Sequence, residues 1–390
     1  MVKPVDAVEL AQTLIAFDTV NPPGNEAACA RWLGSLLQAA GFEVEYHEMA
    51  PGRTSLVAQA GTCTPERTVC FIGHIDTVPL GKTTWKHGPF AGEIVDGRLY
   101  GRGASDMKSG VAAFATAAIG YRPALPEDAG IVLIIACGEE TGCEGSTHLA
   151  SLGLPLGPFA GVIVGEPTGN VPLVGHKGAL WLRAGVRGVA AHGSMPSAGE
   201  NAIDKGIELV QRLHCFCGYR PAHHILGQPT LNIGTFRGGE NVNSVPDWAE
   251  VGIDIRTTPG MDHRETEAEL AALLKPQLDT LHVDISMPHV YTPPEHDWVQ
   301  RVFDIVENVS GTRPAVGTAP YFSDASALQP LINGAPTLIL GPGEVSAMHQ
   351  TDEYCEVAKL RDAVRIYEAL IRMSVDADAR LEHQPAAAEE

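Results

Sequence analysis

Acidic and histidine side chains follow the ends of several short apolar stretches in this sequence. His74 and Asp76 follow one stretch at residues 68–73, and Glu166 follows another at residues 160–164. Because the carboxyl ends of the strands line the ligand crevice of an open α/β sheet, such side chains are expected to converge. The full set of candidate residues is His74, Asp76, Asp106, Glu139, Glu140, Glu166 and His349.

These residue types are suited to binding divalent metal ions. Imidazole nitrogen and carboxylate oxygen are ligands of Zn²⁺, and a carboxylate shared by two ions would hold them about 3.5–4 Å apart. Of the pair Glu139-Glu140, one residue can bind metal while the other stays free as a base. If the chain is extended here, Asp76 points the same way as His74 and can accept its imidazole N–H. The pattern predicts a two-metal site, but it does not choose Zn²⁺ over Mn²⁺ or Co²⁺.

Each candidate also has a structural interpretation when it is taken alone. A histidine after a strand can be a polar loop residue, and Asp106 can cap a helix that begins at Met107. Glu139 and Glu140 can be solvated charges of a loop. The seven residues fall in five separate segments, each expected just after an apolar strand. Five such segments argue against coincidence, so the metal site is the favoured interpretation.

The elements that position these residues alternate between strand and helix. Apolar stretches at residues 68–73, 130–136 and 160–164 are typical of strands buried on both faces. Their alternation with helices predicts a mostly parallel sheet covered on both sides. Further strands are expected at residues 44–49, 55–60 and 336–340, and helices at residues 5–17, 25–40 (capped by Asn25), 107–120, 143–152, 297–309 and 357–373.

The pattern changes after Lys177, where the order of elements becomes β-α-β-β-α-β, as in a ferredoxin-like module with one sheet. We therefore predict an α/β protein whose catalytic, metal-binding domain comprises residues 1–177 and 289–390. Residues 178–288 form an inserted α+β domain. Its strands are expected at residues 179–186, 230–237, 248–256 and 282–287, and its helices at residues 201–214 and 262–274.

The composition is that of a packed protein, with 44% hydrophobic and 19% charged residues among 390. Lys and Arg number 27 against 47 Asp and Glu, so the net charge is −20, which disfavours nucleic acid and anionic membranes as partners. The sequence has no long apolar run and no signal-peptide pattern, so a cytoplasmic location is expected. The eight cysteines are then predicted to be free thiols.

The sequence resembles a family of dizinc amidohydrolases and exopeptidases that includes acetylornithine deacetylase, succinyl-diaminopimelate desuccinylase, aminoacylase and carboxypeptidase G. The resemblance covers nearly the whole chain and rests on several motifs in the family's order. These motifs span residues 73–79, 99–110, 139–141, 165–168 and 348–353. The resemblance implies that His74, Asp106 and Glu166 hold one zinc ion. It implies that Asp106, Glu140 and His349 hold the other.

The same resemblance implies roles for the remaining residues of the centre. Glu139 is the general base that takes a proton from a metal-bridging water, and Asp76 orients His74. His192 matches a lid histidine that stabilises the oxyanion and that family members present to the partner subunit's active site. The inserted domain would thus be a lid through which a homodimer forms. A loop residue that caps the helix at Asn201 is the alternative for His192.

Two further residues of the inserted domain, Asn243 and Arg256, match substrate-binding positions of the family. Arginine suits a carboxylate because its planar fork donates two parallel hydrogen bonds. Arg256 can instead form a structural pair with Asp254 or Glu265.

The implied reaction is hydrolysis of the amide bond of an N-acyl-L-amino acid to a carboxylic acid and a free amino acid. Residues 341–354 look most like acetylornithine deacetylase, whereas residues 318–325 depart from the Gly-Gly-Thr-Ser-type loop of the desuccinylases. Desuccinylase-like, carboxypeptidase- or dipeptidase-like and aminopeptidase-like hydrolysis are alternatives, so the expected substrate is a small N-acyl amino acid or dipeptide. A non-catalytic metal- or ligand-binding protein is disfavoured, because Glu139 and a complete ligand set are present.

Overall fold

The computed structural model describes residues 5–214, 216–218 and 220–375. The chain divides into two compact units. The first comprises Met1–Gly175, Thr292–Ala319 and Ser323–Glu390, and the second comprises His176–Tyr291 and Pro320–Phe322. The second unit contains the whole of the insertion predicted at residues 178–288 and also takes in three residues from later in the chain.

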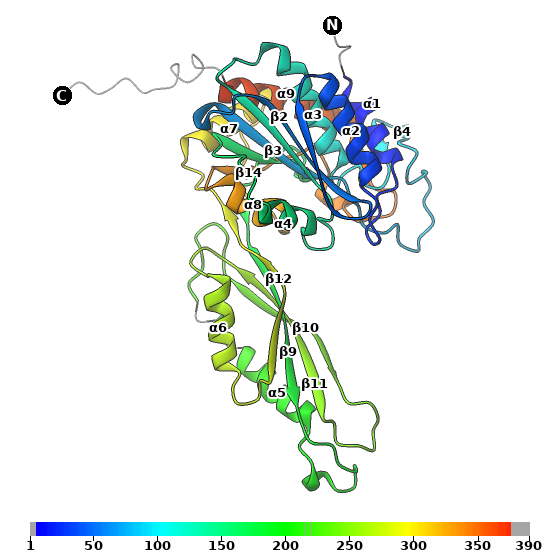
Figure 1. Cartoon of the computed structure of the whole chain (residues 1–390), viewed down its shortest axis with the longest axis vertical. Coiled ribbons are helices and arrows are strands. Elements are labelled where there is room, and N and C mark those ends of the chain that lie inside the picture. The colour runs from blue at the N-terminus through cyan, green and yellow to red at the C-terminus, as the bar shows by residue number, and fades with distance from the viewer. Residues whose placement is uncertain (1–4, 215, 219, 376–390) are drawn as a thin grey trace, which may run out of the picture. The chain divides into compact units, whose positions relative to one another are not determined.

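A six-stranded sheet lies at the centre of the described part of the first unit (Figure 1). In spatial order its strands are β1 (Glu43–Ala50), β2 (Arg53–Gly61), β6 (Gly130–Ala136), β3 (Thr68–His74), β7 (Gly161–Val164) and β14 (Thr337–Ile339). The pairs β6–β3, β3–β7 and β7–β14 are parallel, and the two pairs that involve β2 are antiparallel. The sheet is therefore mostly parallel, which confirms the predicted fold class.

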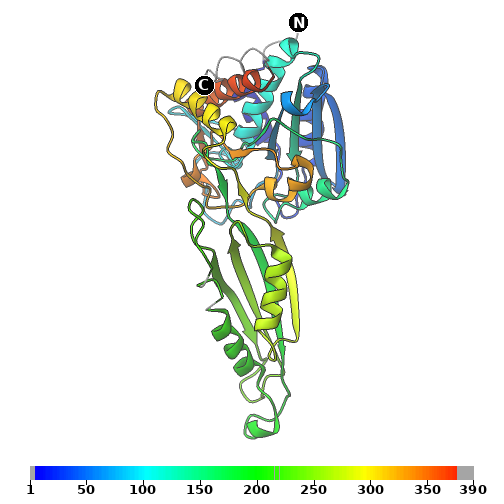
Figure 2. The same cartoon turned by 90° about the vertical axis from the view of Figure 1, so that its left-hand side faces the viewer.

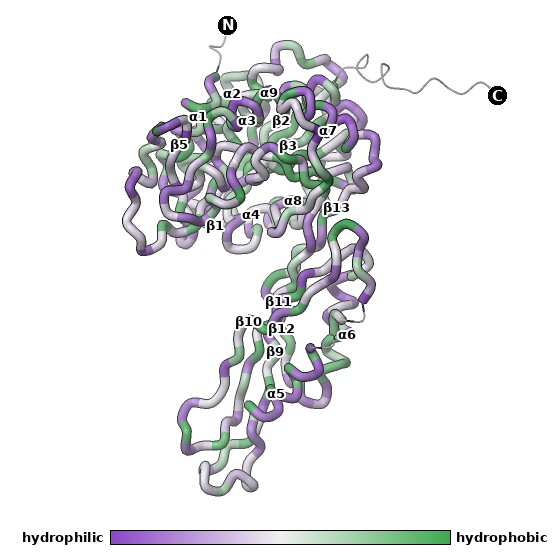
Figure 3. The backbone as a smooth tube through the Cα atoms, turned by 180° about the vertical axis from the view of Figure 1, so that it is seen from behind, coloured by the Kyte–Doolittle hydropathy of each residue, from purple (hydrophilic) through white to green (hydrophobic). Residues whose placement is uncertain are grey.

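The middle strands of this sheet are buried because they are apolar along their whole length. Every residue of β3, β6 and β7 is buried, as expected where helices cover both faces of a parallel sheet. Figure 3 shows the hydrophobic colour along β3. The parallel pairing of these three strands brings their carboxyl ends to the same edge of the sheet.

Helices cover the sheet on both faces. On one side, α1 (Ala7–Ala16), α3 (Lys108–Tyr121) and α9 (Val357–Val375) pack against one another, and α7 (Asp297–Ser310) lies beside α9 (Figure 2). On the other side, α4 (Glu144–Ser151) and α8 (Asp324–Ile332) pack together and contact β2 and β3. The helix α2 (Ala27–Ala39) packs on β1 and β2.

Two details of these helices differ from the predictions. The residue at the N-cap position of α2 is Glu26 and not the predicted Asn25, and no side chain caps this helix. The helix α8 was not predicted at all, since Pro330 lies inside it and its first residues follow a stretch that reads as a loop. By contrast, Asp6 caps α1 as its type favours, with its carboxylate accepting hydrogen bonds from the N–H groups of Val8 and Glu9.

A small antiparallel sheet brings a late segment of the chain beside an early one. Its strands are β4 (Ile94–Val95), β5 (Arg98–Tyr100) and β15 (Tyr354–Glu356). Tyr354 is the partner of Tyr100 in this ladder. The pairing places the segment after His349 next to the loop that leads to Asp106.

The second unit is built on a four-stranded antiparallel sheet. In spatial order its strands are β10 (Thr230–Gly238), β11 (Trp248–Thr257), β9 (Gly178–Arg187) and β12 (Thr280–Met287). With α5 (Ala202–Leu213) and α6 (His263–Leu273), they follow the chain order β-α-β-β-α-β, which confirms the ferredoxin-like module. Two further short strands, β8 (Gly175–His176) and β13 (Val290–Tyr291), form a separate two-stranded sheet.

The core of the second unit lies on one face of its sheet. Alternate residues of β9 and β11, among them Leu182 and Ile253, pack with Leu209 and Leu270 of the two helices. The side chains between them on β11 are only partly buried, so this strand alternates between a buried apolar face and a polar face.

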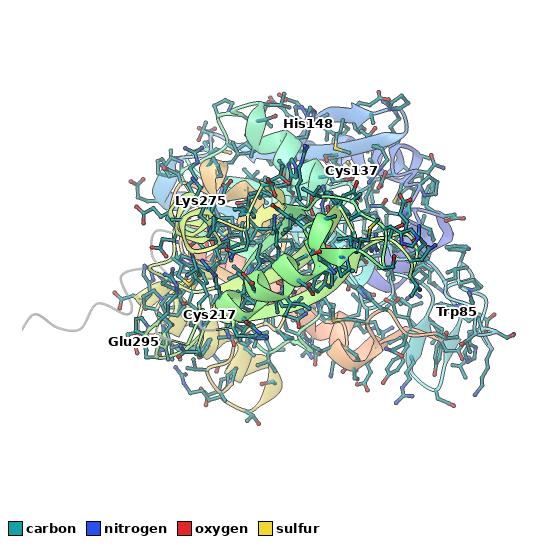
Figure 4. All side chains as sticks on the ribbon, turned by 90° about the horizontal axis from the view of Figure 1, so that it is seen from below. Trp85, Cys137, His148, Cys217, Lys275 and Glu295 are labelled. Atoms are coloured by element: carbon teal, nitrogen blue, oxygen red, sulfur yellow. The ribbon has the colours of Figure 1, made fainter. Side chains whose placement is uncertain are left out.

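The cysteines described by the structure are free thiols: Cys29, Cys63, Cys70, Cys137, Cys143, Cys217 and Cys355. Cys137 of the first unit and Cys217 of the second are marked in Figure 4. The eighth cysteine, Cys215, lies outside the described residues. Within the described ranges, the structure has no helix with the length and apolarity that a membrane span requires.

Candidate metal centre and active site

The carboxyl ends of three neighbouring strands carry the acidic and histidine residues of the first unit. His74 is the last residue of β3, Glu139 follows β6, and Glu166 follows β7. The imidazole Nε2 of His74 lies 3.7 Å from Glu166 Oε1 and 3.9 Å from Glu139 Oε2. The structure therefore brings together side chains that are far apart in the sequence.

Asp106 lies between two histidines. Its Oδ1 is 3.2 Å from His74 Nε2, and its Oδ2 is 3.3 Å from His349 Nε2. Glu140 Oε2 is 3.2 Å from the same nitrogen of His349. The alternative role of Asp106 as a helix cap is wrong, because Met107 precedes α3 and no side chain caps that helix. One carboxylate that faces two imidazoles is the arrangement of a ligand shared by two cations.

The chemistry of this cluster fits divalent cations. One ligand atom from each of His74, Asp106 and Glu140 lies within 4.8 Å of the others. His74 is fully buried, Glu166 is 3% exposed, and Glu140 Oε1 is a buried oxygen without a hydrogen-bond partner. Burying several carboxylates is costly unless positive charge compensates them. Nitrogen and oxygen donors suit Zn²⁺, and they also accommodate Mn²⁺ and Co²⁺.

Asp76 contacts the imidazole of His74 and the backbone of Glu139 and Glu140. Its Oδ1 is 3.4 Å from His74 Nδ1, and the same nitrogen is 3.1 Å from the Asp76 carbonyl oxygen. The carboxylate also accepts hydrogen bonds from the N–H groups of Glu139 (3.0 Å) and Glu140 (3.2 Å). Burial alone would raise the pKa of Asp76, but its hydrogen bonds, first among them that with His74, hold it below the ordinary value. Asp76 is therefore placed to orient both His74 and the acidic pair.

Asn21 is a further residue of this network that the motifs do not include. Its Nδ2 donates to Asp76 Oδ2 and to Thr141 Oγ1, both at 2.9 Å. Asn21 is buried, although the sequence around it reads only as a turn. A turn next to the active-site strand is too weak a signal to have predicted this contact.

Burial shifts the acid–base properties of the cluster. Burial and the neighbouring charges of Glu166 and Asp324 outweigh the opposite effect of His74 and raise the pKa of Glu139 well above its ordinary value. Burial and Asp106 act in the same way on the pKa of Glu166. A carboxylate whose pKa is raised above its ordinary value is better suited to accept a proton and return it.

Asp324 is an acidic neighbour that the motifs also omit. It is the first residue of α8 and is fully buried. Burial is the main cause that raises the pKa of Asp324 to about 6. It lies within the stretch at residues 318–325 that departs from the desuccinylase pattern, and only the packing of α8 against α4 reveals its position.

We predict that Zn²⁺ binding to the metal-free chain at pH 7 releases about one proton or more per chain. Hydrogen bonds with Asp106 and Glu140 raise the pKa of His349 to about 10, so its imidazole is protonated at pH 7 and must lose that proton to bind metal. Metal affinity should therefore rise with pH up to this pKa. Calorimetry in buffers of different ionisation enthalpy counts the protons, and a count of zero would contradict this assignment of His349.

The remaining candidate residues lie in the second unit. His192 Nδ1 is 2.8 Å from Ser194 Oγ, and the N–H of Gly193 donates to the carbonyl of Asn243 at 2.7 Å. His192 and Asn243 are thus on adjacent segments. The side chain of Asn201 itself caps α5, so the alternative role of His192 as that cap is wrong.

Arg256 forms an ion pair with Asp254, one of the two structural partners that the sequence indicates for it. Its Nε lies 3.0 Å from Asp254 Oδ1, and its guanidinium carbon is 6.0 Å from the ring centre of Phe322. Both charged side chains belong to the polar face of β11 and are partly exposed. The pair leaves Arg256 accessible from solvent.

The fold and the cluster define the class of protein. The profile of peptidase family M20/M25/M40 matches residues 70–373, which is more than half of the chain. The chain belongs to this family and is a hydrolase.

Curated relatives share most of the chain's length. The chain is 29% identical over 355 residues to an acetylornithine deacetylase from Vibrio cholerae serotype O1, which covers 88% of this chain and 90% of the relative. It is 31% identical over 334 residues to an acetylornithine deacetylase from Vibrio campbellii, with 83% and 85% covered.

Solved structures show the same fold. An M20 family metallo-carboxypeptidase from Sulfolobus solfataricus superposes with a TM-score of 0.78 at 17% identity, over 95% of this chain and 99% of that one. A dinuclear metal binding peptidase of the M20 family from Bacillus subtilis gives a TM-score of 0.69 at 14% identity, over 95% and 97%.

Proposed function

We propose that this chain is a dinuclear metal-dependent hydrolase that cleaves the amide bond of N-acyl-L-amino acids. The observation that carries the proposal is Asp106, whose two carboxylate oxygens face His74 and His349. His74, Asp106 and Glu166 would hold one cation. Asp106, Glu140 and His349 would hold the other. Zn²⁺ is the proposed metal at both positions, and Co²⁺ and Mn²⁺ are suited to the same ligands.

The residues of this chain would divide the chemistry between them. When bound, a pair of divalent cations supplies Lewis acidity and a water of lowered pKa. Glu139 is buried beside His74 and free of the ligand sets, so it accepts the proton of the attacking water and returns it to the leaving amine. Asp76 keeps His74 in orientation, and His192 stabilises the oxyanion of the tetrahedral intermediate.

An N-acetyl amino acid is the proposed substrate class, with N-acetylornithine first. The Vibrio relatives named acetylornithine deacetylase support this choice. Dipeptides are a second candidate class, since a Sulfolobus structure with this fold is named a metallo-carboxypeptidase. Succinyl amino acids are a further candidate class. We also propose a cytoplasmic location.

A substrate panel tests the proposal. Purified protein loaded with Zn²⁺ or Co²⁺ is assayed against acetyl-, succinyl- and formyl-amino acids and against dipeptides. We expect the highest kcat/KM on an N-acetyl amino acid. Preference for dipeptides would favour a peptidase, and no hydrolysis of any amide would contradict the proposed reaction.

Arg256 is proposed to bind the substrate's α-carboxylate, with Asn243 as a neighbouring substrate contact. Arg256→Lys keeps the charge but loses the two-pronged geometry. We expect kcat/KM for N-acyl amino acids to fall by on the order of 10²-fold, because the scissile carbonyl is less well positioned. Steady-state kinetics on an N-acyl amino acid and on the matching N-acyl amine measure this effect.

The amine lacks the carboxylate, so wild type and variant should hydrolyse it about equally poorly. Arg183→Lys is the matched control, since Arg183 lies on the same sheet and pairs with Asp284. An equal loss on both substrates would instead assign Arg256 to its pair with Asp254.

The second unit is proposed to be a lid through which a homodimer forms. In support, β10 is a mostly exposed edge strand, and large apolar side chains are exposed on it (Phe236) and on the neighbouring helix α5 (Ile207). If His192 serves the partner's active site, mixing His192→Ala with Glu139→Gln and re-associating the subunits should restore part of the activity that each variant lacks. A fully active monomer at assay concentration would rule this arrangement out.

A further inference from the structure

A buried ion pair, Arg102 and Glu353, contacts the segments of the proposed metal centre but belongs to neither ligand set. Arg102 Nη1 lies 2.6 Å from Glu353 Oε2, and the two side chains are 2% and 1% exposed. Removing both charges from water is costly, and such a pair often contributes little net stability compared with apolar residues of the same size. The role of this ion pair is therefore sought in the hydrogen bonds that its two side chains make.

The Glu353 carboxylate fixes the loop that presents Asp106. Its Oε1 accepts hydrogen bonds from the N–H groups of Ser105 (2.8 Å) and Asp106 (3.0 Å). Its Oε2 accepts from the N–H of Gly103 at 3.1 Å in addition to Arg102. Three backbone donors within four residues converge on one carboxylate, so charge-assisted hydrogen bonds tie the loop to Glu353 as far as the N–H of Asp106.

The Arg102 guanidinium connects this loop to the other ligand-bearing segments. Its Nη1 also donates to the carbonyl of Gln350 at 3.2 Å, and its Nη2 donates to the carbonyl of Pro79 at 3.1 Å. Gln350 directly follows His349, and Pro79 ends the motif at residues 73–79 that contains His74. One buried pair thus bonds to all three segments that bring His74, Asp106 and His349 together.

We propose that Arg102 and Glu353 are positioning residues that hold Asp106 and His349 at the spacing required for two cations. The proposal rests on the proposed metal centre. It predicts that the pair controls how long the chain retains metal, beyond any contribution to folding stability. Residues that orient metal ligands typically change metal affinity by about 10- to 100-fold when they are mutated.

Glu353→Gln is the most direct test. One oxygen of glutamine can still accept from the loop, but the amide NH₂ would face the donors of Arg102 and Gly103 and could not accept from them. Glu26→Gln is the matched control, because Glu26 is also fully buried and pairs with Arg53 at 2.9 Å in the same unit. Both variants and the wild type are loaded with Co²⁺ alone and mixed with excess chelator.

We expect Glu353→Gln to release Co²⁺ about 10- to 100-fold faster than the wild type and to show an altered visible Co²⁺ spectrum. Glu26→Gln should keep the wild-type spectrum and release rate, even if its melting temperature falls as much as that of Glu353→Gln. If Glu353→Gln does not fold, Arg102→Lys decides by the same criteria, since lysine cannot reach all three acceptors at once.

Wild-type release rates and spectra in Glu353→Gln, or in Arg102→Lys where that variant decides, would show that the pair is only structural and overturn the proposal. Equal acceleration in Glu26→Gln would also overturn it, because any loss of a buried charge would then suffice. Failure of the wild-type chain to bind Co²⁺ would contradict the metal centre itself, which is a separate outcome.

Discussion

Glu139→Gln is expected to lower kcat by about 10²–10⁴-fold while metal content and fold are unchanged. Glutamine is nearly isosteric with glutamate but cannot accept the proton of the attacking water. The site gives Glu139 this role because the side chain is buried beside His74 and has a raised pKa. Single-turnover kinetics with metal analysis of the same preparation separates loss of the base from loss of metal.

Glu144→Gln provides the control for this substitution. Glu144 belongs to the same segment, but its carboxylate accepts from Thr141 and lies 3.6 Å from Arg53. This variant should turn over like the wild type. A kcat near the wild-type value in Glu139→Gln would remove Glu139 from the role of base.

Asp106→Asn is expected to abolish hydrolysis by more than about 10³-fold and to lower metal content together with it. The asparagine side chain loses the negative charge and offers only one acceptor oxygen, whereas Asp106 presents one oxygen to each histidine. Loss of a shared ligand affects both cations at once. Metal analysis by mass spectrometry after gel filtration, with kcat measured in parallel, follows both effects.

Asp352→Asn is the matched control for this change. Asp352 lies close in sequence to His349, but its Oδ1 accepts from the backbone N–H groups of Lys86 and His87. Asparagine can accept the same bonds and tolerates the positive φ of this position. If Asp106→Asn keeps two ions and normal turnover, Asp106 is not a shared ligand.

The fold was predictable where burial dictates the residue types. The apolar stretches that became β3, β6 and β7 have no polar side chain facing solvent, so periodicity and length identified them. The helix α8 was missed because Pro330 is a poor helix residue and tertiary packing against α4 stabilises the segment. The short strands β5 and β15 pair residues that are far apart in sequence, which local patterns do not reveal.

His74, Glu140 and Glu166 could be chosen from the sequence because they follow the ends of buried strands, whereas Asp106 and His349 were assigned as ligands through the motifs of the family. Asn21, Asp324, Arg102 and the carboxylate contacts of Glu353 could not be assigned in this way. Glu353 accepts hydrogen bonds from backbone groups about 250 positions away, so only the folded chain shows the contact. Arg256 is the opposite case, because the sequence indicates both a substrate carboxylate and Asp254 as its partners. The structure shows the pair with Asp254.

The dependence of hydrolysis on bound cations tests the central claim most directly. Exhaustively demetallated protein is titrated with Zn²⁺ while hydrolysis of an N-acetyl amino acid and bound metal are measured together. The proposed centre predicts no turnover without metal and recovery that is complete at about two ions per chain. Full activity in the demetallated protein would contradict the assignment of this chain as a metal-dependent amide hydrolase.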